Sequence, residues 1–217
     1  MAIIVLDKIK KSYGRHVVLE DFSLEIEQGE LVAIMGPSGC GKSTMLNIIG
    51  LLEDIDSGNI VIDGFVNPRP STVLSNGILR RCINYLFQNF ALVDHKNVEF
   101  NLRLALETQK GSRKDKERAI DAALERVDLK GYRKYKIFEM SAGEQQRVAM
   151  ARALLKPCEI VLADEPTGSL DPQNRDAILS MLKEMNEQGK TVLIATHDPV
   201  VGRECKRVVT FGSKAEG

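Results

Sequence analysis

The apolar run Leu31-Val-Ala-Ile-Met35 leads directly into Gly36-Pro-Ser-Gly-Cys-Gly-Lys-Ser-Thr44, and a helical pattern follows over residues 45–52. The loop matches the motif G-x-x-x-x-G-K-[ST] in the strand, loop and helix context that the motif requires. A buried strand that turns through a glycine-rich loop into a helix is typical of a phosphate-binding site in an α/β protein. This stretch therefore predicts both the fold class and the kind of ligand.

The glycines of the loop permit a backbone whose N–H groups converge on phosphate oxygens, and the following helix adds its positive N-terminal end. We expect the Lys42 ammonium to reach the β- and γ-phosphates and the Ser43 hydroxyl to bind Mg²⁺. The alternative interpretation is a glycine-rich turn with a solvated lysine. The residues assigned to nucleotide binding in this loop are Gly36, Ser38, Gly39, Cys40, Gly41, Lys42, Ser43 and Thr44.

Short apolar runs alternate with longer amphipathic segments, a pattern typical of a mainly parallel sheet covered by helices. Its strands are expected at residues 31–35, 83–87, 160–163, 192–195 and 208–211. Shorter pieces at residues 3–6, 17–19 and 60–63, separated by glycines, predict a small N-terminal antiparallel sheet. The predicted fold class is therefore α/β, and with the phosphate loop it resembles a P-loop NTPase (RecA-like) core, with an antiparallel β subdomain beside it.

Residues 88–155 contain no strand pattern, and they include a helical run at 148–155. Helical periodicity is strongest at 117–129 and, beyond this stretch, at 175–188. We therefore predict one domain, residues 1–217. Residues 1–88 and 156–217 form the catalytic core with its β subdomain, and residues 89–155 form an inserted helical subdomain.

The composition is that of an ordinary globular chain: 217 residues, 43% hydrophobic and 28% charged, with 30 Lys and Arg against 30 Asp and Glu. This balance excludes a general electrostatic attraction to nucleic acid. No apolar stretch approaches the ~20 residues of a membrane span, and the start lacks the features of a signal peptide. The four cysteines stand far apart, which favours reduced thiols over a zinc site or disulfides. A cytoplasmic location is expected.

Polar residues follow four of the expected strands: Gly36, Gln88, Asp164 and, one residue further on, His197. Because the carboxyl ends of parallel strands meet at one edge of a sheet, a single nucleotide could touch all four positions. Asp164 is expected to hold Mg²⁺ and Glu165 to orient or deprotonate the attacking water. Taken singly, each has a plainer interpretation: the acid pair as the start of a loop, Gln88 as a turn residue and His197 as a helix start.

Residues 141–147, Ser-Ala-Gly-Glu-Gln-Gln-Arg, open the helical run 148–155. Ser141 and Glu144, three residues apart, make a capping box. A helix N-terminus that offers a serine hydroxyl and a glycine N–H is also an anion site, so Ser141 and Gly143 could bind a γ-phosphate. Both interpretations can hold together.

As a set, these motifs resemble the nucleotide-binding subunit of an ATP-binding cassette (ABC) transporter over nearly the entire chain. The resemblance identifies Gln88 with the Q-loop, residues 141–147 with the signature, Asp164 and Glu165 with the Walker B acids, and His197 with the switch histidine. It also identifies residues 169–171, Ser-Leu-Asp, with the D-loop and Tyr13 with the aromatic residue that stacks on adenine.

This resemblance implies ATP and Mg²⁺ as cofactors and a role for each site residue. The catalytic residues are Glu165, His197 and Gln88, and the metal ligands are Ser43, Gln88 and Asp164. Beyond the phosphate loop, the residues expected to contact ATP are Tyr13, Ser141, Gly143, Glu144 and Asp171.

Finer features, including Asp164-Glu-Pro-Thr-Gly-Ser-Leu-Asp171, resemble the branch that serves lipoprotein release, macrolide efflux and bacteriocin or peptide export. Residues 85–94 resemble ATPases of lactococcin-type bacteriocin exporters. Against the family's common signature Leu-Ser-Gly-Gly-Gln, Ala142 replaces the first glycine and Glu144 the glutamine. The Cβ at position 142 is expected to crowd a backbone that must approach phosphate and to slow hydrolysis.

The family resemblance further implies a homodimer, formed on ATP binding, in which Ser141 of one subunit closes over the ATP held by Lys42 and Glu165 of the other. The partners expected are transmembrane permease subunits, which would hold the protein at the inner face of the cell membrane. Their contact is expected at the short apolar stretch of Phe90, Leu92 and Val93. The alternative for that stretch is ordinary core of the helical lobe.

Two functions stay open on the sequence. One is an ATPase subunit that drives export or membrane extraction of a peptide, bacteriocin, lipoprotein or drug. The other is a mechanical signalling ATPase of a cell-division or wall-remodelling complex, with no transported substrate. Soluble ABC ATPases of DNA repair or translation are disfavoured because the chain has one cassette and no sustained heptads, and other P-loop kinases lack residues 141–147.

Overall fold

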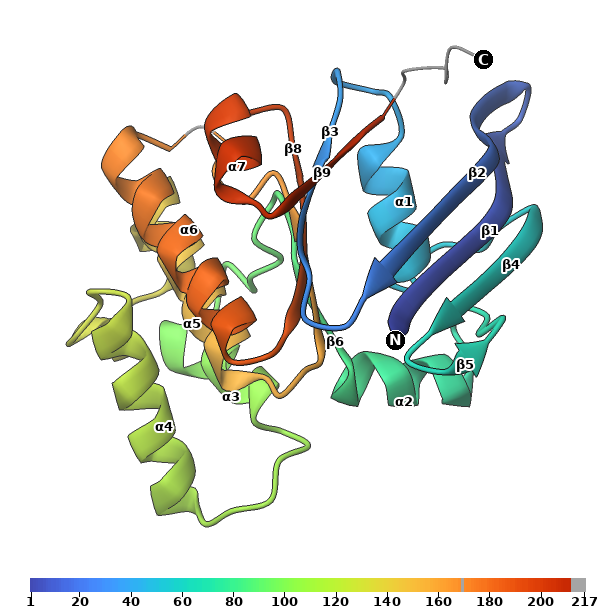
Figure 1. Cartoon of the computed structure of the whole chain (residues 1–217). Helices are drawn as coiled ribbons and strands as arrows, with labels where there is room; N and C mark the ends of the chain where they lie inside the picture. The colour runs from blue at the N-terminus through green and yellow to red at the C-terminus, as the bar shows by residue number, and fades with distance from the viewer. Residues whose placement is uncertain (169, 212–217) are drawn as a thin grey trace.

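A parallel sheet forms the centre of the computed structural model, which describes residues 1–168 and 170–211. Among these residues the sheet has five strands in the order β6-β7-β8-β3-β9 (Figure 1). In chain order they are β3 (Leu31–Met35), β6 (Ile83–Leu86), β7 (Ile160–Asp164), β8 (Thr191–Thr196) and β9 (Arg207–Thr210). β7 and β8 are buried throughout, as expected for parallel strands covered on both faces. All five strands agree with the sequence analysis.

An antiparallel sheet, ordered β2-β1-β4-β5, stands beside the parallel one. Its strands are β1 (Ala2–Tyr13), β2 (His16–Glu27), β4 (Ser57–Ile62) and β5 (Phe65–Val66). β1 and β2 form a long hairpin in which Tyr13 pairs with His16 across a two-residue turn at Gly14, whose φ of 59° suits glycine. The sequence predicted the sheet but only short pieces of it, because charged residues on the solvent side interrupt the apolar pattern of β1 and β2.

Helices cover both faces of the parallel sheet (Figure 1). On one side α1 (Lys42–Ile49) lies between the two sheets, and α2 (Val73–Arg81) precedes β6. The other side carries α3 (Val98–Ala105), α4 (Arg113–Arg126), α5 (Ala142–Leu155), α6 (Pro172–Glu187) and α7 (Pro199–Glu204), with 3₁₀ turns η1 (Tyr132–Lys134) and η2 (Ile137–Glu139). The sequence analysis did not identify α2 and α3. Their N-caps, Thr72 and Asn97, are the local signals that could have found them.

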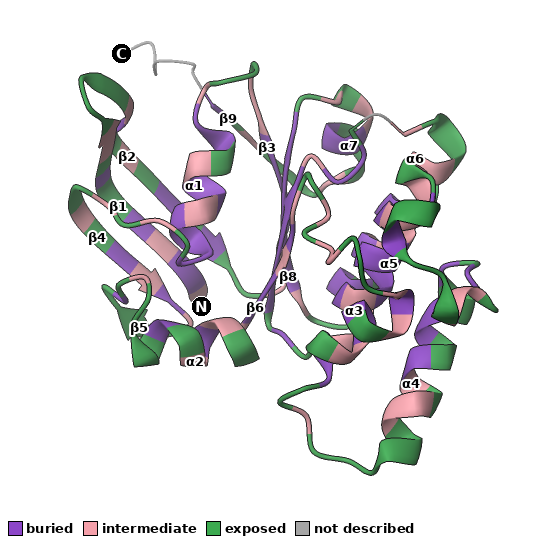
Figure 2. Ribbon diagram, turned by 180° about the vertical axis from the view of Figure 1, so that it is seen from behind, coloured by how far each residue is buried: buried purple, intermediate pink, exposed green. Residues whose placement is uncertain are grey.

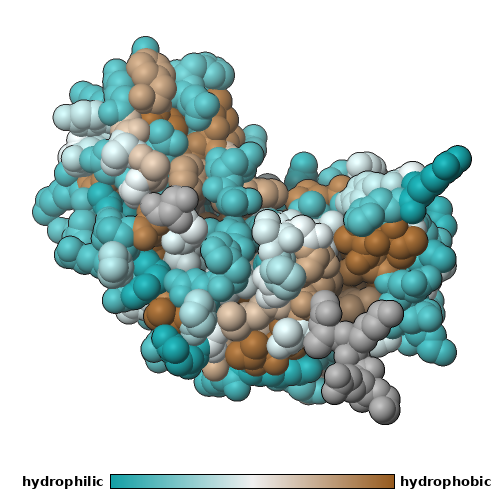
Figure 3. Space-filling view, turned by 90° about the horizontal axis from the view of Figure 1, so that it is seen from above, coloured by the Kyte–Doolittle hydropathy of each residue, from teal (hydrophilic) through white to brown (hydrophobic). Residues whose placement is uncertain are grey.

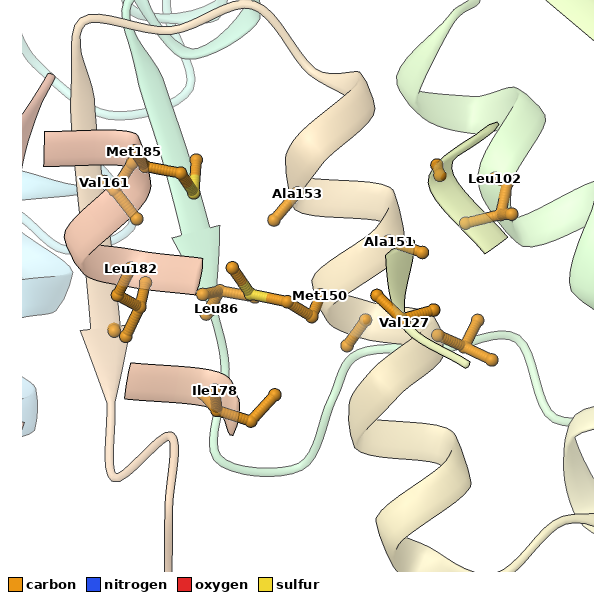
Figure 4. Close-up of a cluster of buried hydrophobic side chains, with 14 of the residues drawn as sticks. Leu86, Leu102, Val127, Met150, Ala151, Ala153, Val161, Ile178, Leu182 and Met185 are labelled. Carbon is orange, nitrogen blue, oxygen red and sulfur yellow. The ribbon is translucent and has the colours of Figure 1, made fainter. Parts of the chain in front are cut away.

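Two hydrophobic cores lie on opposite faces of the parallel sheet. One joins α3 to α6 with the sheet, and Figure 4 shows Met150 of α5 reaching toward Leu86 and Leu182. The other joins α1, α2 and the antiparallel sheet to the opposite face. Successive β7 residues alternate between them: Val161 and Ala163 belong to the first core, Ile160 and Leu162 to the second. The helical lobe therefore shares its core with the sheet.

The surface follows from this packing. Buried residues fill the central strands and the inward faces of the helices, while the outer faces of α4 and α2 are exposed (Figure 2). Seen from the end that carries the loop between β3 and α1, hydrophobic patches are scattered among hydrophilic residues (Figure 3). Within the described residues, no helix combines the length and the hydropathy of a transmembrane segment.

Candidate functional site

The loop between β3 and α1 forms one wall of a cavity of about 770 Å³. Gly41 caps α1 with a φ of 106°, and a Cβ added there would come within 2.8 Å of the Val18 side chain. A Cβ on Gly36 would come within 2.7 Å of the Phe211 carbonyl oxygen. Both positions therefore require glycine, because one needs a left-handed backbone and both are tightly enclosed. The lining from this loop comprises Pro37, Ser38, Gly39, Gly41, Lys42, Ser43 and Thr44.

Lys42 holds the loop closed. Its ammonium is buried and donates hydrogen bonds to the carbonyl oxygens of Gly36 at 2.8 Å and Pro37 at 3.0 Å. It also lies 4.0 Å from the Glu165 carboxylate. The ammonium is thus placed where the arriving phosphates of a nucleotide could take over its hydrogen bonds.

Ser43, which lines the cavity, contacts Asp164 behind it. The Ser43 hydroxyl, on the first turn of α1, donates to Asp164 Oδ1 at 3.0 Å, and Asp164 is the last residue of β7. Burial raises the pKa of Asp164, and the Ser43 hydrogen bond only partly opposes this effect. A hydroxyl and a desolvated carboxylate are oxygen ligands of the kind that suits a hard divalent cation.

Two side chains hold the Glu165 carboxylate at the edge of the sheet. His197 Nδ1 lies 3.0 Å from one of its oxygens, and the Thr196 hydroxyl donates to the other at 3.3 Å. The backbone of Glu165 has a φ of 45°, in the left-handed region that is unfavourable for a residue with a Cβ. Such strain at a polar, well-held residue is common at functional sites. His197, predicted as a residue of this site, thus contacts Glu165 directly.

The carboxyl ends of the parallel strands lie at one edge of the sheet, as the sequence predicted. Met35 pairs with Thr196 and Asp164 with Ala195, so these strands end side by side. Gln88, two residues beyond β6, is exposed and lines the same cavity as Lys42, Glu165 and His197.

The capping box at the start of α5 is confirmed. Ser141 is the N-cap, Glu144 N–H donates to its hydroxyl, and Glu144 Oε2 accepts from the Ser141 N–H at 2.8 Å. The Ser141 hydrogen bond also lowers the pKa of Glu144. Ser141, Gly143 and Glu144 do not line the phosphate cavity of this chain. One copy of the chain therefore does not bring these three residues to the cavity that Lys42 and Glu165 line.

Asp171 lies outside the cavity as well, as the N-cap of α6. Its carboxylate accepts from the Asn174 N–H at 3.1 Å, and Asn174 Oδ1 accepts from Arg147 of α5 at 2.6 Å. The Gln146 side chain donates to the Pro166 carbonyl oxygen just after Glu165. The first turns of α5 are thus tied to the segment that follows β7. Ser169, predicted in the same loop, lies outside the described residues.

Cys40 and Tyr13, two other residues predicted to bind ATP, do not line the cavity. The Cys40 side chain packs against the second core rather than into the cavity. Tyr13 is half exposed and sits near Glu53 and Thr44, and burial is the main cause of its raised pKa. It does not line the cavity, whereas His16 and Val18 of the neighbouring strand do.

Sequence reasoning missed His16 and Val18, and assigned no role to His16. Their proximity to the loop depends on how the β1–β2 hairpin folds over it. The Gly14 turn between Tyr13 and His16 was the available signal. Of the apolar stretch proposed as a membrane-partner contact, Phe90 and Leu92 pack against the first core, as the alternative interpretation predicted.

Comparisons with known proteins agree with this geometry. A family model described as ABC transporter matches residues 19–168. The chain is 38% identical to the uncharacterized ABC transporter ATP-binding protein YvrO of Bacillus subtilis, over 95% of this chain and 92% of that protein. It is 37% identical to the macrolide export ATP-binding/permease protein MacB of Escherichia coli, over 95% of this chain but 33% of that protein, so it spans about a third of the length of that relative.

Among solved structures, the chain is similar to the ATP-binding cassette MJ0796, in a dimeric post-hydrolysis state bound to ADP and Pi. The TM-score is 0.89 at 36% identity, with 96% of this chain and 94% of that chain covered. It is also similar to cbiO1 of Clostridium perfringens, part of the transporter complex cbiONQ, with a TM-score of 0.81 at 27% identity, covering 96% of this chain and 84% of that one.

Proposed function

The chain belongs to the ABC transporter family as an ATPase cassette, and from that premise we propose that it powers export or membrane extraction through separate permease subunits. The cargo class is a peptide, lipoprotein or drug. The likeness to the macrolide exporter MacB, whose ATP-binding part is fused to its permease, supports this direction of transport. The lactococcin-type likeness of residues 85–94 favours a bacteriocin within that class.

One observation carries the proposal: the chain holds two incomplete halves of a nucleotide site. The cavity offers Lys42, Glu165 and His197 to the phosphates, while the Ser141 cap lies outside it. Two copies arranged head to tail would bring each Ser141 cap over the partner's cavity and complete both sites. The dimeric state of the MJ0796 cassette supports this arrangement.

Ser43, Gln88 and Asp164 fit a magnesium ion. Ser43 and Asp164 already share a hydrogen bond, and the Gln88 side chain lines the same space. These residues would hold the ion. When bound, Mg²⁺ neutralises charge on the phosphate oxygens and orients them for attack.

The chain's own residues then have distinct tasks in hydrolysis. Lys42 binds the terminal phosphates, and Glu165 accepts the proton of the attacking water. His197 and Thr196 orient the Glu165 carboxylate by hydrogen bonds at 3.0 and 3.3 Å. A positioned base of this kind contributes about 10²- to 10⁴-fold to a rate.

We place the membrane partner against a groove of about 390 Å³ beside the turn that follows Gln88, lined in part by Tyr85, Phe87, Ala91 and Leu104. Docking there would hold the ATPase at the inner face of the cell membrane. It would also put the partner next to a residue of the nucleotide cavity, so that ATP-driven movement could reach the permease.

The test is size-exclusion chromatography of a Glu165→Gln variant with and without Mg-ATP. An ATP-dependent shift from monomer to dimer, abolished by adding Ser141→Arg, supports the composite site. Absence of a shift together with normal ATP binding contradicts dimerisation by ATP alone. Pull-down of the membrane partner then separates transport from signalling, because a partner with a large extracellular domain and no substrate-stimulated ATPase activity favours the signalling alternative.

A further inference from the structure

Glu144 places a negative charge beside the anion site that Ser141 offers. One oxygen of its carboxylate, Oε2, accepts hydrogen bonds from the Ser141 N–H and from the Ser141 hydroxyl, both at 2.8 Å. A serine hydroxyl has a single proton, so Ser141 cannot donate to Glu144 and to a phosphate at the same time. The carboxylate therefore competes with an incoming phosphate, because it takes the proton of Ser141 and also repels the phosphate charge.

Tyr132 gives the Glu144 carboxylate another hydrogen-bond donor. Tyr132 lies in the 3₁₀ turn η1, and the hydrogen bond between its hydroxyl and Glu144 raises the pKa of Tyr132. The pKa of Glu144 is lowered most by Ser141 and further by Tyr132, with a contribution from the positive charge of Arg147. An ionised carboxylate only accepts hydrogen bonds, so the Tyr132 hydroxyl is the donor. Glu144 therefore keeps a donor when the Ser141 hydroxyl turns elsewhere.

The Tyr132 ring is held by parts of the chain other than the start of α5. It packs against the first core and stacks on Tyr135, with ring centroids 4.9 Å apart and planes inclined by 27°. The next residue, Arg133, is paired with Glu99 of α3 at 3.0 Å and with Asp121 of α4 at 3.2 Å. The position of the Tyr132 hydroxyl is thus set by α3, α4 and the core, independently of the Ser141 side chain.

We infer that Tyr132 is a positioning residue for the Ser141 cap. When the nucleotide of a second copy arrives, Tyr132 holds the Glu144 carboxylate, and the Ser141 hydroxyl turns from Glu144 to the γ-phosphate. The Ser141 N–H stays bonded to Glu144, so the cap of α5 survives this exchange. Without the Tyr132 hydroxyl, Glu144 keeps the proton of Ser141. This inference rests on the proposed function, because it requires a second copy of the chain over the cavity.

The first experiment compares two stacked tyrosines. Tyr132→Phe removes the hydroxyl but keeps the ring in the stack, and Tyr135→Phe makes the same change in the other ring. Both are placed in the Glu165→Gln background, and light scattering measures the ATP concentration that gives half-maximal dimerisation. Tyr132→Phe should raise this concentration about fivefold, as the loss of one hydrogen bond of ordinary net strength does. Tyr135→Phe should leave it unchanged.

ATP binding to the monomer is the second measurement on these variants. A fluorescent ATP analogue, titrated at a protein concentration too low for dimerisation, should bind Tyr132→Phe as tightly as the parent chain, because Tyr132 does not line the cavity. A general distortion of the fold would weaken both monomer binding and dimerisation. Equal shifts of dimerisation in Tyr132→Phe and Tyr135→Phe, or none in Tyr132→Phe, would overturn the positioning role.

The second experiment is a double-mutant cycle with Glu144→Gln. Glutamine keeps an oxygen that accepts from the Ser141 N–H but carries no charge, so no carboxylate has to be held for the phosphate to bind. In the Glu144→Gln background, Tyr132→Phe should therefore change half-maximal dimerisation by less than about twofold. A fivefold change that persists in this background would show that Tyr132 acts through packing alone, and the inference would be wrong.

The wild-type and Glu165→Gln chains distinguish this inference from the proposed function. If the wild-type chain neither binds nor hydrolyses ATP, the proposed function is wrong. If the Glu165→Gln chain binds ATP but stays monomeric at every ATP concentration, the composite site and this inference fail together. If it dimerises with ATP while Tyr132→Phe and Tyr135→Phe behave alike, only this inference is wrong.

Discussion

The phosphate cavity and the start of α5 both offer hydrogen-bond donors to an anion, but they differ in which of their polar side chains already contact one another. In the cavity, Ser43 already contacts Asp164, and Glu165 already contacts His197. At the start of α5, Ser141 and Glu144 form hydrogen bonds with each other and do not line the cavity. Under the proposed function, this difference assigns the chemistry of hydrolysis to one copy of the chain and the closure of the site to a second copy.

Glu165→Gln is expected to have the largest effect, because it removes the carboxylate of the phosphate cavity that would accept the proton of water. It should lower kcat by about 10³-fold, since a positioned general base is lost, while ATP binding survives. Phosphate release in steady state measures this. Glu159→Gln, the same change near the start of β7, is the control and should behave as wild type. Comparable losses in the two variants would contradict the role of Glu165.

Ser141→Ala tests the N-terminus of α5, and a second serine that caps a helix in the same way is the control. Ser112 caps α4 with the same kind of capping box, formed with Asp115. Either Ser→Ala change should cost about 1 kcal/mol of stability, measured by urea unfolding. Only Ser141→Ala should also lower kcat, by about 10²-fold, because a donor to the phosphate is lost. If Ser112→Ala lowers kcat equally, the effect at Ser141 is structural alone.

Gly143→Ala adds a methyl group where the isolated chain has room for it. The nearest atoms to a Cβ at this position are 3.9 and 4.0 Å away. Melting should therefore be unaffected or slightly raised. A phosphate brought by a second copy would meet the methyl group, and we expect kcat to fall about tenfold, the equivalent of ~1.4 kcal/mol. An unchanged kcat would mean that no ligand approaches this face.

Ala142→Gly makes the opposite change one residue earlier. Ala142 is exposed in the first turn of α5, so removing its methyl group disturbs little in the chain itself. The ATPase rate should rise about twofold, corresponding to about 0.4 kcal/mol of relief against the partner's phosphate. Initial-rate assays at saturating ATP measure it. A rate equal to or below wild type would show that the methyl group is accommodated.

Asp164→Asn tests the stability of the phosphate cavity in the absence of Mg²⁺. Burial raises the folded-state pKa of Asp164 above its unfolded value, so the ionised carboxylate destabilises the fold at neutral pH, and this penalty fades as the pH falls through the folded-state pKa toward the unfolded one. Without Mg²⁺, the variant should melt about 2–4 °C higher at pH 7, as ~1 kcal/mol gives in a chain of this size. The gain should vanish near pH 4. A lower melting temperature at pH 7 would contradict the desolvation argument.

The sequence predicted the cavity residues at the strand ends better than the helices and the hairpin around them. The strands β3, β7 and β8 are continuous apolar runs, and polar residues at their ends are easy to see, so Lys42, Gln88, Glu165 and His197 could be assigned to one site. α2 and α3 escaped because they are short and half exposed. His16 and Val18 escaped because their place in the cavity depends on the folding of a hairpin over the loop, which no local pattern encodes.

The alternation of β7 between two cores has a consequence for how such a chain can diversify. Val161 and Leu162 are neighbours in sequence, yet one packs with the helical lobe and the other with α1 and the antiparallel sheet. Substitutions that reshape the lobe for a new membrane partner can therefore accumulate on one face without repacking the face that supports the phosphate loop. Because β7 separates the two cores, residues of the helical lobe can change while the residues that pack behind the phosphate loop stay the same.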